Sequence, residues 1–207
     1  MLSDIQIEDL SQKMTIPLAG VYFKDELPIK LECNKTYIIN LDDSTDDNGN
    51  FNSGTHWTLL QINKYPNDNI EPIYFDPYGV PPPENIKKIV KQNFKQNLPF
   101  TNKDIQSLMN NSCGFYTLAF SYWINVYDKR SKLLYEDVCS FMSMFDDLNT
   151  SIDWKKNEYI LKHFFQSSEP KLRKEIDVIK PISSISSETG KGQPDMMKMK
   201  VDINYVK

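Results

Sequence analysis

The sequence predicts an α+β fold in which a small mixed sheet packs against a central buried helix, with further helices around it. Two observations predict this arrangement. An almost uncharged stretch runs from Cys113 to Tyr127, and its apolar side chains cover most of a helical wheel. A helix of that kind is buried on nearly every side. Three short runs, at residues 37–41, 56–62 and 73–75, have the β-branched and aromatic composition of strands.

The first third of the chain alternates ordered and polar segments. Ser3 or Asp4 can cap a short helix that ends near Met14. Prolines bracket residues 16–28 and a glycine lies within them, which predicts an extended, ordered loop rather than a helix. After the strand at 37–41, residues 42–54 are almost wholly polar and predict a surface loop. A calcium loop is the alternative there, but the EF-hand spacing and its closing Glu are absent.

The middle and the end of the domain combine a hairpin with amphipathic helices. The strands at 56–62 and 73–75 flank a turn at 65–69, and together they predict an antiparallel hairpin. Residues 104–106 predict another short strand. The spacing of apolar residues predicts helices at residues 84–96, 133–145 and 152–165.

The chain of 207 residues is long enough for one domain with a sizeable core. We assign that domain to residues 1–166. Residues 167–207 form a Ser- and Lys-rich C-terminal arm or tail, and the alternation at 201–206 would allow it to dock as an added strand. A freely moving tail is the equal alternative.

Composition excludes several classes of protein. The net charge of −4 gives no general argument for a nucleic-acid surface. Three widely spaced cysteines form no disulfide framework and indicate a reducing compartment. No run of 18 apolar residues predicts a membrane span, and the first residues lack the features of a signal peptide. No zinc pattern, P-loop or dinucleotide motif is present, so we expect no cofactor and no metal.

Four polar residues lie where the predicted elements can bring them together. Cys113 begins the central helix, where the helix dipole and free N–H groups favour a thiolate. His56 starts one strand of the hairpin and Asp76 follows the end of the other, so antiparallel pairing places them side by side. Gln106 precedes the cysteine by seven residues.

These residue types support nucleophilic catalysis. Cys113 would be the nucleophile, His56 the general base and Asp76 the group that orients the imidazole. The amide of Gln106 and the backbone N–H of Cys113 would form the oxyanion hole. Each residue alone has an ordinary structural explanation, whereas their joint order on these elements is far more specific.

The order of these motifs resembles a known family. The resembling segments are Gly20–Pro28, Ile39–Asp42, Gly54–Trp57, Tyr74–Gly79, the prolines at 81–83, Gln106 and Cys113–Tyr116. They resemble the adenovirus-type and Ulp1-like (clan CE) cysteine proteases, most closely the proteases of Maverick/Polinton elements and virophages. The resemblance covers about residues 1–165.

The resemblance implies a papain-like, Ulp1-like fold and assigns the site residues. The base falls on His56, the acid on Asp76, the oxyanion amide on Gln106 and the nucleophile on Cys113. Trp57 and Gly114, which directly follow the base and the nucleophile, are assigned to the substrate cleft.

The resemblance also implies a biological role. It suggests a monomeric viral endopeptidase that cleaves capsid precursor proteins during particle maturation, after small-residue or Gly-containing sequences. Its places of action would be the virion and the host-cell cytoplasm. Adenovirus relatives are stimulated by a short peptide and by DNA, and nothing in this sequence demonstrates dependence on such an activator.

Three alternatives remain open at this stage. An isopeptidase that removes ubiquitin or a SUMO-type modifier would share the fold and the triad. An acyltransferase on the same scaffold would need an acyl-CoA site, and no basic, phosphate-binding loop is present. A non-catalytic binding module would not need the intact set of His56, Asp76, Gln106 and Cys113.

Overall fold

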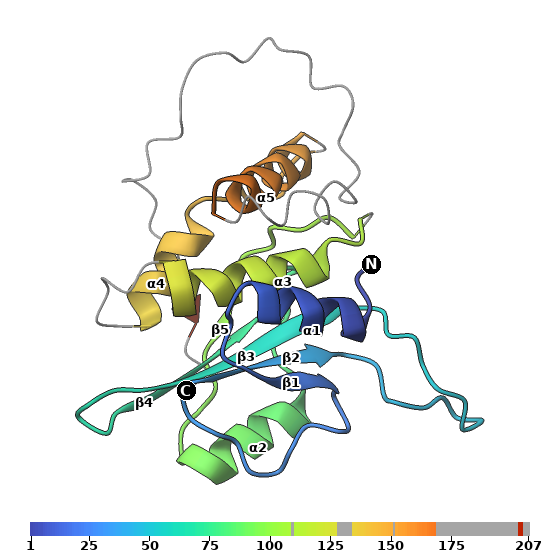
Figure 1. Ribbon diagram of the computed structural model, residues 1–207, viewed down its shortest axis with the longest axis vertical. Coiled ribbons are helices and arrows are strands. Elements are labelled where there is room, and N and C mark those ends of the chain that lie inside the picture. The colour runs from blue at the N-terminus through green and yellow to red at the C-terminus, as the bar shows by residue number, and fades with distance from the viewer. Residues whose placement is uncertain (109, 128–133, 151, 169–202, 205–207) are drawn as a thin grey trace.

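The chain folds around one mixed sheet, as the computed structural model shows (Figure 1). The structure describes residues 1–108, 110–127, 134–150, 152–168 and 203–204. In this part of the chain the sheet has six strands in the order β1-β2-β3-β4-β5-β6. The strands are β1 (Leu18–Phe23), β2 (Lys35–Asn40), β3 (Trp57–Lys64), β4 (Ile70–Phe75), β5 (Phe100–Thr101) and β6 (Ile203–Asn204).

Pairing in the sheet is both parallel and antiparallel. Strand β2 runs antiparallel to β3, and β3 runs antiparallel to β4, whereas β1 pairs in parallel with β2 and β4 with β5. In the β3–β4 hairpin Leu59 lies opposite Phe75, and Lys64 lies opposite Ile70. The hairpin expected from the sequence is therefore confirmed, with its register fixed by this ladder.

Six helical segments complete the described part of the chain. They are α1 (Asp4–Lys13), α2 (Glu84–Phe94), α3 (Cys113–Tyr122), the π-helix η1 (Trp123–Tyr127), α4 (Leu134–Met142) and α5 (Asp153–Ser168). Helix α1 begins with a capping box, in which Ser3 accepts from the backbone of Gln6 and the Gln6 side chain accepts from the backbone of Ser3. The positions of these helices confirm those expected from the apolar spacing.

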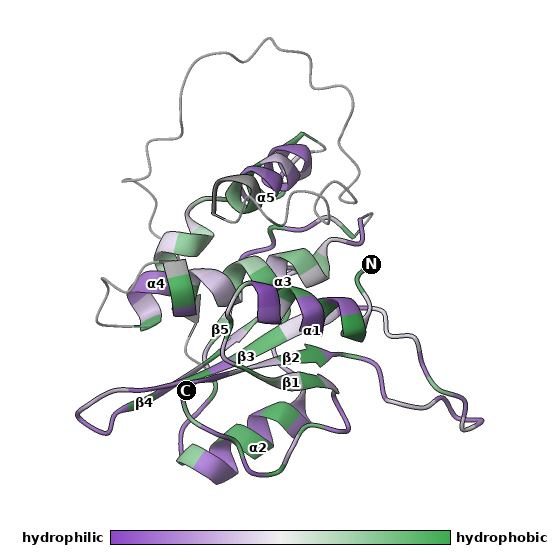
Figure 2. Ribbon diagram, viewed as in Figure 1, coloured by the Kyte–Doolittle hydropathy of each residue, from purple (hydrophilic) through white to green (hydrophobic). Residues whose placement is uncertain are grey.

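The helices divide unequally between the two faces of the sheet (Figure 1). Helices α1, α3, α4 and α5 lie on one face and share the larger apolar cluster. Every residue of α3 is buried. Helix α2 covers the other face and packs through Ile86 and Val90 onto a smaller cluster. Figure 2 shows that α2 carries both hydrophilic and hydrophobic residues, as expected for a helix with one side on the sheet and the other in solvent. The sequence expectation of an α+β fold with a central buried helix holds.

Two sequence expectations differ from the structure. Residues 18–23, expected in an extended loop, form the edge strand β1, because their extended backbone pairs in parallel with β2. Residues 104–106 form no strand, because the N–H groups of Ile105 and Gln106 both donate to the carbonyl of Pro77 instead of to a sheet ladder.

Most of the predicted C-terminal arm lies outside the described residues. Within it, Ile203 and Asn204 form β6 and pair antiparallel with Thr101 and Phe100. Helix α5 extends to Ser168, two residues past the expected end of the domain at 166. The division of the chain at this point stays a prediction. None of the helices described here is long and apolar enough to cross a bilayer.

Candidate active site

His56 and Asp76 form a buried pair at the end of the β3–β4 hairpin that lies away from its turn. The Nε2 atom of His56 lies 2.8 Å from Oδ1 of Asp76, and the Asp76 side chain is fully buried. Strand β3 begins directly after His56 and β4 ends directly before Asp76. The antiparallel pairing therefore brings an imidazole and a carboxylate together, as the sequence predicts.

A tight turn holds the Asp76 carboxylate in place. Its Oδ1 also accepts from the backbone N–H of Tyr78 at 2.8 Å, and its backbone carbonyl accepts from Gly79 at 2.9 Å. Gly79 has φ +67°, and a Cβ there would lie 2.8 Å from the carbonyl oxygen of Asn102. Only glycine combines this backbone conformation with so close an approach, so the turn has little freedom to shift the carboxylate.

Tyr78 is a site residue that the sequence analysis did not assign. Its ring stacks on the imidazole of His56, with ring centroids 4.2 Å apart and an angle of 15° between the planes. The β3–β4 ladder ends at the pair Leu59 and Phe75, so the turn from Asp76 to Gly79, and not strand pairing, brings this ring onto the imidazole. The signal in the sequence was an aromatic residue two positions after Asp76.

Cys113 is the first residue of α3 and interacts with the imidazole of His56. Burial of the ring disfavours its charged form. The hydrogen bond and charge of Asp76, together with the nearby Cys113, outweigh burial and raise the pKa of His56 to about 9. Because Asp76 occupies Nε2, the nitrogen left for the thiol is Nδ1, which has no hydrogen-bond partner among the described residues. Such loose geometry is common in catalytic pairs without substrate.

The sulfur is close to the imidazole but shielded from solvent. Cys113 is 1 % exposed and His56 is 9 % exposed. Burial, and after it the charge of Cys113, raises the pKa of Tyr78 to about 12, although this tyrosine is only half-buried. A peptide can reach the sulfur only if neighbouring side chains move when it binds.

Gln106 is buried beside the turn that carries Asp76. Its backbone N–H donates to Pro77 at 3.1 Å. Its side-chain Nε2 donates to the carbonyl of Asn110 at 3.2 Å and lies 3.4 Å from the hydroxyl of Tyr78. The amide is thus joined to the triad through Tyr78, and it is fixed on its other side by a residue that precedes Cys113.

Trp57 and Gly114, which the sequence analysis assigned to a substrate cleft, lie together beneath Leu2. The indole Nε1 of Trp57 donates to the carbonyl of Leu2 at 2.9 Å, and Trp57 is 2 % exposed. A Cβ on Gly114 would lie 3.2 Å from the side chain of Leu2 and 3.4 Å from Trp57. In this structure both residues pack inward, and their role toward substrate stays a prediction.

Three buried polar atoms at this site have no hydrogen-bond partner in the part of the chain that the structure describes. They are Nδ1 of His56, Oδ2 of Asp76 and Oε1 of Gln106. Buried polar atoms are almost always paired, so each exception calls for an explanation. Their concentration on three of the four predicted catalytic side chains is what a site prepared for a reacting group would produce.

The described residues contain no group of three or more His, Cys, Asp or Glu that could hold a metal ion. In comparisons with known proteins, no protein-family model matches the chain, and no curated protein matches it either. The functional argument therefore depends on the geometry of the site and on the motifs in the sequence.

Proposed function

We propose that this chain is a cysteine endopeptidase that acts through Cys113, His56 and Asp76. The observation that carries the proposal is the 2.8 Å bond between buried His56 and Asp76 beside the thiol at the start of α3. A nucleophile, a base within reach of it and a third group that orients the base are the parts that covalent acyl transfer requires.

Acylation begins from the charged pair of thiolate and imidazolium. With the pKa of His56 raised to about 9, the ring carries its proton at neutral pH. The sulfur attacks the scissile carbonyl carbon, and the carbonyl electron pair moves onto oxygen. Gln106 and the Cys113 N–H donate to that oxyanion. His56 then gives its proton to the amine as the C–N bond breaks, which leaves a thioester.

Deacylation returns the site to its starting state. The neutral His56 takes a proton from water while the hydroxide attacks the thioester carbonyl. When the C–S bond breaks, the sulfur leaves as a thiolate beside the newly protonated ring. Asp76 keeps the ring oriented through both steps, because its Oδ1 bonds Nε2 and leaves Nδ1 as the ring nitrogen available to the thiol.

The finer fold and family assignments are part of the proposal. We assign the chain to the papain-like, Ulp1-like fold because its nucleophile begins a buried helix while its base and acid belong to the adjacent sheet. The motif order of the adenovirus-type and virophage proteases supports the same assignment.

The substrate is proposed from the family resemblance. We expect capsid precursor proteins to be cleaved during particle maturation, in the virion and the host-cell cytoplasm, by a monomeric enzyme. Incubation of the chain with the capsid precursor of the same genome, followed by N-terminal sequencing of the products, tests this. The expected result is one or a few defined cuts that the Cys113→Ala variant does not make.

Two outcomes would contradict the proposal. Cleavage by Cys113→Ala at the wild-type rate would remove the thiol from the mechanism. An intact precursor, together with rapid covalent capture of a ubiquitin-family activity probe by Cys113, would instead assign the site to an isopeptidase.

A further inference from the structure

Two neighbouring residues on α5, Asn157 and Glu158, contact the residues around the proposed oxyanion hole. Both are buried, at 0 % and 6 % exposed, although the helix carries exposed residues directly beside them, such as Tyr159. Sequence analysis placed the helix but assigned neither residue a role. Their contacts fall on the two stretches that contain Gln106 and Cys113.

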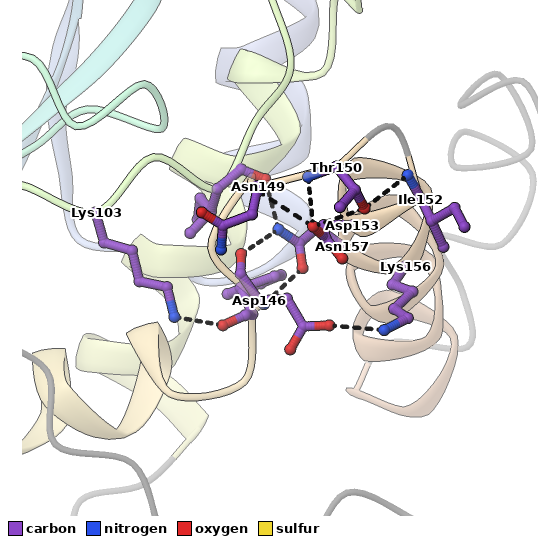
Figure 3. Close-up of polar contacts among 10 residues, drawn as sticks. Lys103, Asp146, Asn149, Thr150, Ile152, Asp153, Lys156 and Asn157 are labelled. Carbon is purple, nitrogen blue, oxygen red and sulfur yellow. Dashed lines mark hydrogen bonds and ion pairs between the residues drawn. The ribbon is translucent and has the colours of Figure 1, made fainter.

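Asn157 holds the residue before Gln106. Its Nδ2 donates to the carbonyl of Ile105 at 3.0 Å and to the carbonyl of Asp146 at 2.8 Å, and its Oδ1 accepts from the backbone N–H of Asp146 at 2.8 Å. Figure 3 shows the surrounding network, in which Asn157 on α5 bonds to the loop at Asp146. Since both ends of the amide are engaged, Asn157 has little rotational freedom, and it fixes the backbone next to Gln106.

Glu158 holds the two polar residues that precede Cys113. Its Oε1 accepts from Nδ2 of Asn110 at 2.8 Å, and its Oε2 accepts from Oγ of Ser112 at 2.8 Å. Burial raises the pKa of Glu158, while the hydrogen bonds from Ser112 and Asn110 oppose that effect. Both carboxylate oxygens are therefore occupied by residues close to the nucleophile in the sequence.

The contact with Ser112 changes how α3 begins. Ser112 is the N-cap residue, and a serine there ordinarily accepts from an N–H of the first helical turn. Here its side chain makes no cap hydrogen bond, and its hydroxyl donates to Glu158. That bond fixes the serine side chain in an orientation in which its oxygen does not accept from the N–H groups at the start of α3, the region that supplies the Cys113 N–H to the oxyanion.

The contact between Glu158 and Asn110 links the carboxylate to Gln106, the second proposed oxyanion donor. Glu158 fixes the side chain of Asn110, and the carbonyl of the same residue accepts from Nε2 of Gln106. One carboxylate on α5 thus acts on both donors, through Ser112 on one side and through Asn110 on the other. Burying a carboxylate costs desolvation free energy, and apolar side chains could fill the same volume at a lower free-energy cost. The presence of Glu158 at this buried position therefore favours a role beyond packing.

We propose that Glu158 is a positioning residue that sets the oxyanion hole, holding the Gln106 amide and the start of α3 in place through Asn110 and Ser112, while Asn157 fixes the backbone beside Gln106. The inference rests on the proposed function, since it assumes that an oxyanion forms at Cys113. It adds a residue that acts through others and does not touch the substrate.

The test compares two reactions of the same thiol. A short acetylated peptide aldehyde ending in glycinal adds to the sulfur reversibly. The new C–S bond forms as the carbonyl electron pair moves onto oxygen, which then lies in the oxyanion hole. Iodoacetamide alkylates the sulfur with loss of iodide and forms no oxyanion. Aldehyde affinity reports on the oxyanion hole and on the thiol together, whereas the alkylation rate, followed by mass spectrometry of the Cys113 peptide, reports on the thiol alone. Comparing the two therefore distinguishes a defect in the oxyanion hole from a defect in thiol reactivity.

The variants are Glu158→Gln, Glu158→Ala and the control Glu84→Gln, which removes an exposed carboxylate of α2. For Glu158→Ala we expect kcat and aldehyde affinity to fall together by about 10-fold to 100-fold, less than the roughly 10²–10³-fold cost of removing an oxyanion donor itself. KM and the alkylation rate should stay within about twofold. Glu158→Gln keeps one acceptor oxygen, so it should lie between wild type and Glu158→Ala.

Two results would overturn the inference. Aldehyde affinity equal to wild type in Glu158→Gln, measured at a temperature where thermal unfolding shows that variant to be folded, would leave Glu158 with a packing role only. A parallel loss of aldehyde binding and alkylation would place the defect in the thiol rather than in the oxyanion hole. Both measurements need no turnover, so they decide the inference even where peptide cleavage, and with it the proposed function, fails.

Discussion

The two halves of the proposed site are held by different kinds of contact. The base and the acid lie 20 residues apart and are brought together by the backbone ladder of one hairpin. Cys113 and Gln106 are positioned by side chains of α5 that contact residues 46 to 52 positions away in the sequence. The hairpin half should therefore tolerate most side-chain changes away from His56 and Asp76. The half supported by α5 should be sensitive to single substitutions far from the nucleophile.

Removal of the nucleophile disables both halves at once and has the largest expected effect. Cys113→Ala should abolish turnover, because no other group at the site can form the thioester. The fold should survive, since the change deletes one atom from a buried position and costs on the order of 1 kcal/mol. Cleavage assays beside thermal unfolding check this, and residual activity in a folded variant would disprove the assignment.

Asp76→Asn tests the hairpin half alone. Turnover should fall by up to about 10⁴-fold, as when a triad loses its orienting carboxylate. The pKa of His56 should also drop from about 9, because the hydrogen bond and charge of Asp76 contribute to raising it. NMR titration of the His56 ring measures this, and His163, which is exposed on α5, provides an internal control.

The same titration has a consequence for stability. Since the folded pKa of His56, about 9, exceeds its ordinary value of 6.5, protonation stabilises the fold fully below about pH 6.5, and this stabilisation is lost as the pH rises through 9. Urea unfolding across this range should show the loss in wild type and a smaller loss in Asp76→Asn. Equal slopes in the two proteins would contradict the coupling.

Gln106→Ala tests the other half. The rate should fall by about 10²–10³-fold if the amide donates to the oxyanion. The pH profile of the remaining activity should keep its alkaline limb near the His56 pKa of about 9, because burial, Asp76 and Cys113 are what shift that pKa. An unchanged rate would remove Gln106 from the mechanism, and a shifted alkaline limb would show that the two halves are not independent.

Tyr78→Phe has the smallest expected effect, and it tests the contact that joins the halves. The variant keeps the ring that stacks on His56 and removes the hydroxyl that lies 3.4 Å from Gln106. Because that contact is long, we expect a loss of only about threefold in kcat, within the range of a weak hydrogen bond. Tyr78→Leu, which also removes the stacked ring, should lower the pKa of His56 as well.

The two halves also differ in how far the sequence predicts them, because one depends on strand pairing and the other on side chains of a distant helix. Residues that a short hairpin brings together could be inferred, because strand pairing relates positions by a fixed register. The burial of α3 and the place of Cys113 at its start followed from composition. The contacts of Leu2 with Trp57 and of Glu158 with Ser112 could not be inferred, because they depend on how distant segments dock. No periodicity in the sequence encodes that docking.

The separation of the apolar interior by the sheet has a practical use. Among the described helices, α2 alone lies on the far face of the sheet. The exposed side chains of Lys88 and Lys91 belong to it, away from the thiol and its neighbours. A dye or a tether attached there would have the thickness of a β-sheet between itself and the reacting groups. Anchored on that side, the molecule would present its opposite face to a large substrate particle without obstruction.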